Sequence, residues 1–247
     1  MRRSFLLAAM IVTCAASAGY TQTGDVLTPI ETAVACAPPP TADAVPGHAL
    51  QIIGSQDPLP RALFSNRDLV VIGGGTTSGL APGQQFFVRR RITFGGTSNA
   101  RGVKTLGWVR VVAVNESTAI ALVVHVCSGI VSSDYLEPFA APVLPVGIDR
   151  DDTPGEADFS TLGHIITGAD DRLTVGARDF ALIDWGAAQG LTAGARFAIY
   201  RDVGVHGMPL ANVGEGVVVS TGSTTALARV TRARDAIYSG DYIALRK

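Results

Sequence analysis

Hydrophobic and polar positions alternate over short stretches of this chain, and residues typical of turns separate the stretches. Residues 68–72 (Asp-Leu-Val-Val-Ile) are rich in β-branched side chains, as strands usually are. They lead toward residues 79–83 (Gly-Leu-Ala-Pro-Gly), a turn whose proline fixes φ and whose last glycine tolerates a positive φ. Phe86 and Val88 then occupy alternate positions of a further strand. No later segment shows a sustained helical period, so the pattern predicts antiparallel β structure.

The pattern occurs twice, as two copies of one module. Two blocks keep their order and spacing: residues 68–90 recur as 179–201, and residues 107–136 recur as 214–243. Only the connection between the blocks changes in length from one copy to the other. Most recurring positions are glycine or hydrophobic, but Arg90 also recurs, as Arg201, which indicates a shared structural role. Self-similarity of this extent indicates tandem copies of one folding unit.

Each copy predicts five or six short strands around an interior of small and β-branched residues, an arrangement that closes as a compact barrel. Earlier strands near 49–54 and 162–167 are expected to complete the barrels. The predicted fold class is all-β, with two tandem small antiparallel β-barrels. Module 1 covers residues 47–138 and module 2 covers residues 159–247. Residues 139–158, with three prolines and an acidic stretch, are predicted to form an exposed linker.

The N-terminus has the features of a secretory signal peptide at residues 1–18. Two arginines precede a short apolar run, and Ala16-Ser17-Ala18 is a small-residue cleavage site. The run is shorter than the roughly 20 residues that span a bilayer, so we expect an exported chain, periplasmic or secreted, without a transmembrane segment. Acylation of Cys14 would instead make a lipoprotein, although Ile-Val-Thr before it matches that processing poorly. Residues 19–46, with three consecutive prolines, are predicted to be an extended lead-in.

Removal of the signal peptide leaves two cysteines, Cys36 and Cys127. In an oxidising compartment an even pair predicts a disulfide, and two unpaired buried thiols are the alternative. Cys127 falls at a strand end of module 1 where module 2 has Arg234. The bond would therefore attach the lead-in to module 1 and would not belong to the shared fold.

The recurring motifs resemble a known module. Each copy combines a strand, G-[LV]-x-x-G, F-x-[VI]-x-R, a variable loop, and a turn of Ser or Gly followed by Asp-Tyr. This pattern resembles the C-terminal domain of the flagellar assembly protein T and similar C-terminal domains of periplasmic proteins with LysM domains. The resemblance covers residues 48–138 and 162–246, and it implies small β-barrels that serve assembly in the envelope or at the flagellar base.

Composition and motifs argue against several function classes. A net charge of -1 argues against nucleic acid as the partner. Gly73-Gly74-Gly75 follows a strand, but Pro82-Gly83 comes too soon for the helix that a dinucleotide fingerprint requires. The four histidines are scattered, and no serine lies in a nucleophile-elbow motif. No catalytic residue, metal or cofactor is predicted, and a hydrolase with a site assembled from distant residues is the alternative.

One local concentration of basic residues lies on a strand of module 1 and the variable loop after it. Its candidate partner-binding residues are Arg89, Arg91, Arg101 and Lys104, with Trp108 close by as a residue specific to this copy. Such a cluster is able to contact an anionic polymer or an acidic protein face. The alternative is a solvated strand face whose arginine stems cover apolar surface, and Trp108 would then serve packing.

The leading hypothesis is an exported, non-enzymatic structural protein of the bacterial cell envelope. It would bind an envelope protein or a cell-wall polymer through the loops of its barrels, because loops on a rigid scaffold commonly carry binding. The alternative is a module that binds a small ligand or a carbohydrate in a cleft between the two barrels.

Overall fold

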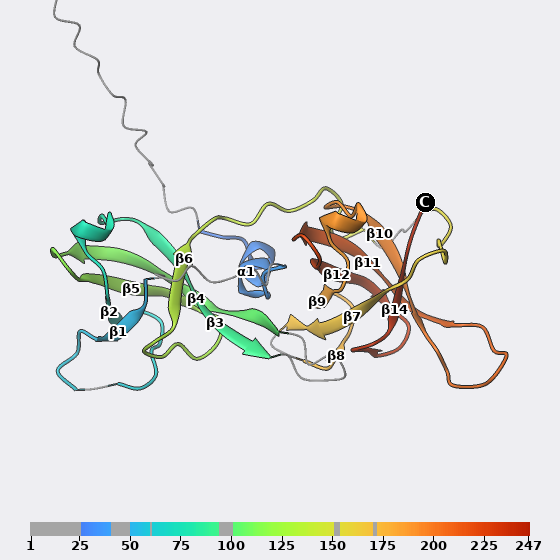
Figure 1. Cartoon of the computed structure of the whole chain (residues 1–247), viewed down its shortest axis with the longest axis horizontal. Coiled ribbons are helices and arrows are strands. Elements are labelled where there is room, and N and C mark those ends of the chain that lie inside the picture. Colours follow the sequence, from blue (N-terminus) through green and yellow to red (C-terminus); the bar gives the residue numbers. More distant parts are fainter. Residues whose placement is uncertain (1–25, 41–49, 60, 94–100, 151–153, 170–171) are drawn as a thin grey trace, which may run out of the picture.

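The computed structural model describes residues 26–40, 50–59, 61–93, 101–150, 154–169 and 172–247 (Figure 1). The predicted signal peptide, its cleavage site and Cys14 lie outside the described residues, as do residues 41–49 of the lead-in. Two β modules lie side by side along the long axis of the molecule, and one short helix lies between them (Figure 1).

Module 1 is an antiparallel sheet of six strands in the order β1-β2-β5-β4-β3-β6. The strands are β1 (Ile52–Ser55), β2 (Leu69–Ile72), β3 (Gln85–Thr93), β4 (Arg101–Val114), β5 (Ala119–Val126) and β6 (Tyr135–Pro138). Among the described residues no strand ladder joins the edge strands β1 and β6. An isolated bridge between Gln51 and Tyr135 links the two edges, as do backbone hydrogen bonds of Ile52 with Ser133 and Asp134. The backbone N–H of Leu136 also donates to the oxygen of Leu50 at 2.7 Å. The sheet is therefore open, although its edges approach each other.

Module 2 is a closed six-stranded barrel in the order β10-β11-β12-β9-β7-β14. Its strands are β7 (Gly163–Gly168), β9 (Phe180–Ile183), β10 (Arg196–Arg201), β11 (Ala211–Thr221), β12 (Ala226–Ala233) and β14 (Tyr242–Leu245). A small two-stranded sheet, β8 (Thr174–Val175) with β13 (Ile237–Tyr238), lies beside it. The barrel closes where Tyr242 and Ile243 of β14 pair with His164 and Gly163 of β7.

The two modules have the same strand order and register, which confirms the repeat at the level of backbone pairing. Val71 pairs with Ile120 in module 1, and Leu182 pairs with Leu227 at the equivalent positions of module 2. The prediction of two barrels is correct for module 2 but not for module 1. The two modules differ where the first strand meets the last: β7 and β14 form a ladder in module 2, whereas Leu50, Gln51 and Ile52 of module 1 make only an isolated bridge and separate hydrogen bonds there.

Each module has its own hydrophobic core, built from the residues that recur in the sequence. Module 1 buries Ile72, Phe86, Val88 and their neighbours, and module 2 buries Ile183, Phe197, Ile199 and their neighbours at matching positions. The turn glycines also match: the first glycine of each turn motif, Gly79 and Gly190, has φ of 76° and 78°. The sequence repeat is thus a repeat of core and turns.

The lead-in contains a helix, α1 (Pro29–Cys36), where an extended segment was expected. Thr28 caps the helix: its hydroxyl accepts from the N–H of Glu31 at 3.4 Å, and the Glu31 carboxylate accepts from the N–H of Thr28 at 2.7 Å. The Thr28 hydroxyl also donates to the Glu31 carboxylate at 2.7 Å, and the donations from this hydroxyl and from the Thr28 N–H hold the pKa of Glu31 below its usual value. Pro29 suits the first helical position, and the prolines from Pro38 onward end the helix. Eight residues give too little periodicity to stand out in a hydrophobic pattern.

Helix α1 packs against both modules. Ala35 lies in a cluster with Phe87 and Trp108 of module 1. Ile30 and Val34, one helical turn apart, pack with Ala37 against an apolar cluster on the outer face of module 2. The space between the modules is therefore filled by helix and side chains.

Candidate functional site at the module junction

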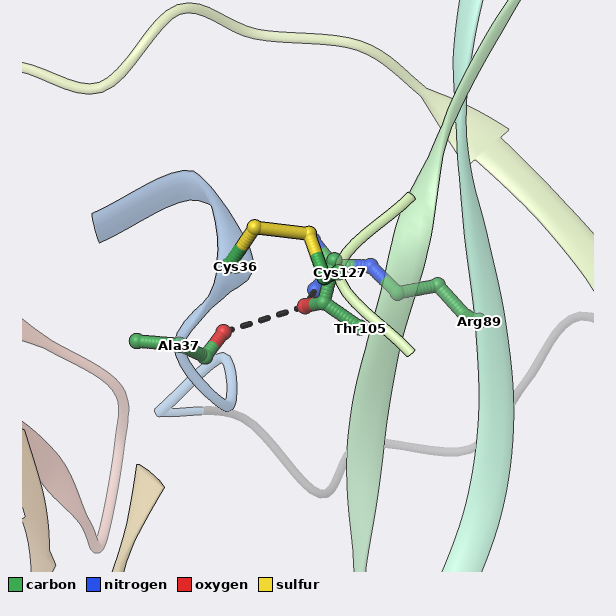
Figure 2. The surroundings of a disulfide bond; sticks show 5 residues. All are labelled: Cys36, Ala37, Arg89, Thr105 and Cys127. Carbon is green, nitrogen blue, oxygen red and sulfur yellow. Dashed lines mark hydrogen bonds between the residues drawn. A yellow bond between two sulfur atoms is a disulfide. The ribbon is translucent and has the colours of Figure 1, made fainter. Parts of the chain in front are cut away.

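A disulfide between Cys36 and Cys127 anchors the end of α1 to module 1 (Figure 2). The Cα atoms are 5.4 Å apart and the sulfur atoms 1.99 Å apart, so the predicted pairing is confirmed. Cys127 directly follows β5, and its N–H donates to the oxygen of Leu106 at 2.8 Å. The bond closes a loop across 91 residues of sequence and fixes the helix to the sheet of module 1.

Hydrogen bonds extend this anchor on both sides of the helix. Thr105 of β4 donates from its hydroxyl to the backbone oxygen of Ala37 at 3.0 Å, and the guanidinium of Arg89 donates to the same hydroxyl (Figure 2). On the other side, the hydroxyl of Thr225 in module 2 donates to the backbone oxygen of Pro40. The segment after α1 is therefore held by a threonine from each module.

The face of module 1 under α1 is aromatic. Phe87 meets Trp108 edge to face, with ring centroids 6.5 Å apart, and packs on Phe139 at 4.6 Å. His125 stacks on Trp108 at 4.5 Å, and its burial lowers the pKa of its imidazole. The equivalent position of Trp108 in module 2 is Glu215, which forms an ion pair with Arg246 at 3.1 Å. The copy-specific aromatic residues thus make the seat for the helix.

Two of the residues predicted to bind a partner lie in this seat. Trp108 is buried beneath α1, and Arg89 is buried with its guanidinium 4.3 Å from the centre of the Phe87 ring. Arg89 also forms an ion pair with Glu137 at 3.3 Å, and burial lowers the pKa of its guanidinium. Neither side chain is open to a partner in this structure, because the helix covers the face that carries them.

The other predicted residues lie further along the hairpin of β3 and β4. Arg91 and Arg101 are exposed, and the pairs Arg91–Val103 and Thr93–Arg101 place them on the same face of the hairpin. Lys104 is half-buried and pairs with Arg90, so it points to the opposite face. Of the four predicted basic residues, Arg91 and Arg101 alone are both exposed and on the same face of the hairpin.

Three possible metal ligands also meet at the anchor: the sulfurs of Cys36 and Cys127 and an imidazole nitrogen of His125 lie within 4.8 Å of one another. Thiolate is the form of cysteine that binds metal. Because the two sulfurs are bonded to each other, the arrangement here is a disulfide beside a stacked histidine.

A hollow of about 320 Å³ lies between the linker and module 2, lined by Ile148, Asp149, Arg178, Arg229, Val230 and Thr231. Arg229 lies on the outer face of β12 and is buried there. It forms an ion pair with Asp149 at 2.7 Å and lies over the ring of Phe180. Arg196 of β10 holds the same stretch of linker by donating to the backbone oxygen of Gly147 at 2.7 Å. Part of the predicted exposed linker is therefore packed against the barrel.

Sequence reasoning missed the helix and its two-sided packing. Thr28-Pro-Ile-Glu31 is a capping-box motif with proline at the first helical position, and this motif could have predicted the start of the helix. The coverage of Arg89, Trp108 and Arg229 had no local signal, because segments distant in sequence cover them.

No helix within the described ranges is long and apolar enough to cross a membrane. The chain matches no protein-family model, and a search of curated proteins finds no significant match.

Proposed function

We propose that this chain is an exported, non-enzymatic structural protein of the bacterial cell envelope, which binds another envelope component through loops of its β modules. The observation that carries the proposal is the disulfide-anchored helix between the modules. A helix that buries apolar side chains against both modules favours one fixed arrangement over a hinge or an open cleft. A fixed pair of modules suits a scaffold that presents loops.

Two further observations support the proposal. The disulfide fits an oxidising compartment, where such bonds form and persist, in agreement with the signal peptide expected from the sequence. The resemblance of the repeated motifs to envelope-assembly domains favours the same kind of role. The partner would be an envelope protein or an anionic cell-wall polymer, and the binding surface would be the exposed arginines of the β3–β4 hairpin, Arg91 and Arg101.

The alternative, a small-ligand or carbohydrate module with its site between the barrels, has less support. A pocket lined by aromatic residues at the junction would favour this alternative, but the aromatic residues Phe87 and Trp108 are buried under α1. The hollow beside the linker is lined by charged and aliphatic residues, and the ion pair of Arg229 with Asp149 occupies part of its wall.

The test measures retention of the purified mature chain on two probes: isolated peptidoglycan with its attached anionic polymers, and immobilised detergent-solubilised envelope proteins. The double variant Arg91→Ala, Arg101→Ala should bind the probe that retains the wild type about tenfold more weakly, with little change in melting temperature. The matched control is Arg232→Ala with Arg234→Ala, which removes exposed arginines at the end of β12 in module 2.

If the control variant loses binding to the same extent, the loss depends on net charge alone and the hairpin is rejected as the binding surface. A wild-type chain that neither probe retains would reject the binding role itself.

A further inference from the structure

The outer faces of the two modules occupy equivalent positions but have different surroundings. In module 2 this outer face is formed by the apolar residues Ile166, Phe180, Leu182, Val217, Val219 and Leu227, all of which are buried. Ala37 and Ile148, from the lead-in and the linker, cover one part of it. Ile92, near the end of β3 in module 1, packs on Ile166 and Leu182 and covers another part.

The equivalent face of module 1 keeps its apolar character and is uncovered by the described residues. By strand register, five positions of this face carry apolar residues in both modules; in module 1 they are Ile53, Leu69, Val71, Val112 and Ile120. At the sixth position module 1 has Arg110 where module 2 has Val217. Ile53 is 56% exposed and Val112 is 43% exposed, and the other four are exposed or half-buried. Solvent-exposed β-branched and aliphatic residues gathered on one sheet face are typical of a surface that receives a partner.

The hairpin that would fit this face is also present, in module 2. Because Arg90 and Arg201 are equivalent, the counterpart of Ile92 is Val203. Val203 is 48% exposed, and the same β10–β11 connection carries Val205 and Met208, which are 59% and 61% exposed. This connection projects from the body of the molecule, at the lower right of Figure 1.

We infer that the chain associates head to tail with a second copy of itself: the β10–β11 hairpin of one copy docks on the outer face of module 1 in the next, repeating the contact that Ile92 makes within the chain. The two surfaces of this contact are different, so each copy keeps one of each open and the association extends into a filament or closes into a ring. Asp202 beside Val203 provides an opposite charge for Arg110. Since the contact lacks α1 and the linker, it is weaker than the internal one and depends on concentration.

The experiment measures the mass of the purified mature chain by sedimentation and light scattering over about 1–300 µM. The wild type is expected to form larger species as the concentration rises. Ile53→Asp and Val203→Asp, each at an exposed position, should raise the dissociation constant at least about tenfold. The matched controls, Leu59→Asp and Leu173→Asp, place the same charge at exposed leucines outside both surfaces and should assemble like the wild type.

Mixing the two variants tests the head-to-tail geometry directly. Ile53→Asp keeps an intact hairpin and Val203→Asp keeps an intact face, so the mixture should form a one-to-one dimer that grows no further. A wild type that stays monomeric over the whole range, a loss of assembly in the controls, or a mixture without the dimer would overturn the inference. None of these outcomes bears on Arg91 and Arg101, so failure here is separable from failure of the envelope-binding proposal.

Discussion

The guanidinium group of Arg90 binds the carboxylate of Asp134 through two hydrogen bonds of 2.8 Å each. Arg201 binds Asp241 in the same way in module 2, at 2.8 and 2.6 Å. Both carboxylates are almost fully buried, and the hydrogen bond to Asp134 raises the pKa of Arg90. Each arginine therefore ties its strand, β3 or β10, to the turn that precedes the last strand of its module, which is the shared structural role expected from the repeat.

Replacement of Arg90 by alanine should lower the free energy of unfolding by about 2 kcal/mol, because it leaves the Asp134 carboxylate buried without its charge partner. Arg90→Lys should recover only part of the loss, since an ammonium group lacks the planar fork that makes two parallel hydrogen bonds. Urea denaturation measures both. Arg61→Ala is the control: Arg61 makes ion pairs with Asp57 and Asp68 at the surface and should cost under about 1 kcal/mol. Equal losses at Arg90 and Arg61 would contradict the prediction.

The disulfide should contribute about 2–4 kcal/mol to stability, because it closes a long loop in the unfolded chain. The variant Cys36→Ser with Cys127→Ser should show this loss in urea denaturation, and protease should cut near α1 sooner than in the wild type. Reductant should lower the wild-type midpoint to that of the variant and leave the variant unchanged. A wild-type midpoint that does not respond to reductant would argue that the bond does not form in the purified protein.

Much of the internal structure of each module was predictable from the sequence. Strand positions and turn glycines follow from short-range patterns that occur twice, and two copies make each pattern easier to recognise. The recurrence of Arg90 as Arg201 indicated a shared structural role but did not identify Asp134 as its partner. The pairing of Cys36 with Cys127 followed from their number and the expected compartment. These features depend on local residue types or on simple counting.

The arrangement between elements was not predictable in the same way. Alternation along β12 places Arg229 on the outside of the barrel, but the pattern does not distinguish an open outer face from a covered one, and Arg229 is buried. Trp108 and Arg89 were treated as surface candidates for the same reason. The closed barrel of module 2 and the open sheet of module 1 differ only in the pairing of the first strand with the last, a difference within the usual error of element boundaries.

Tyr135 should make the protein lose stability at alkaline pH. Burial raises the pKa of its phenol to about 12, above the value near 10 of an unfolded tyrosine. Below about pH 10 the phenol is neutral in both states, and its contribution is lost as the pH rises toward 12, on the order of 1 kcal/mol. Tyr135→Phe should remove this part of the alkaline loss, and it also removes a buried hydroxyl that has no hydrogen-bond partner among the described residues.

Urea midpoints between pH 9 and about pH 11.5 measure the effect of Tyr135. Tyr242→Phe, at the equivalent position of module 2, is the control and should keep the alkaline loss because it leaves Tyr135 in place. Identical pH profiles for wild type and Tyr135→Phe would refute the assignment.

His125 should make the seat of α1 sensitive to mild acid. Burial lowers the pKa of its imidazole, so the folded state favours the neutral ring that stacks on Trp108 at 4.5 Å. The unfolded chain takes up a proton near pH 6.5, whereas the folded chain does so only at lower pH, so the stabilising contribution is full above 6.5 and falls below it. His125→Phe keeps a stacked ring without a titrating group, and the stability difference between variant and wild type should widen from pH 7.5 to pH 5. The other histidines are the same in both proteins, so the difference between the two reports on position 125. Tryptophan fluorescence adds a local readout, and a difference that stays constant across this pH range would show that His125 does not carry the effect.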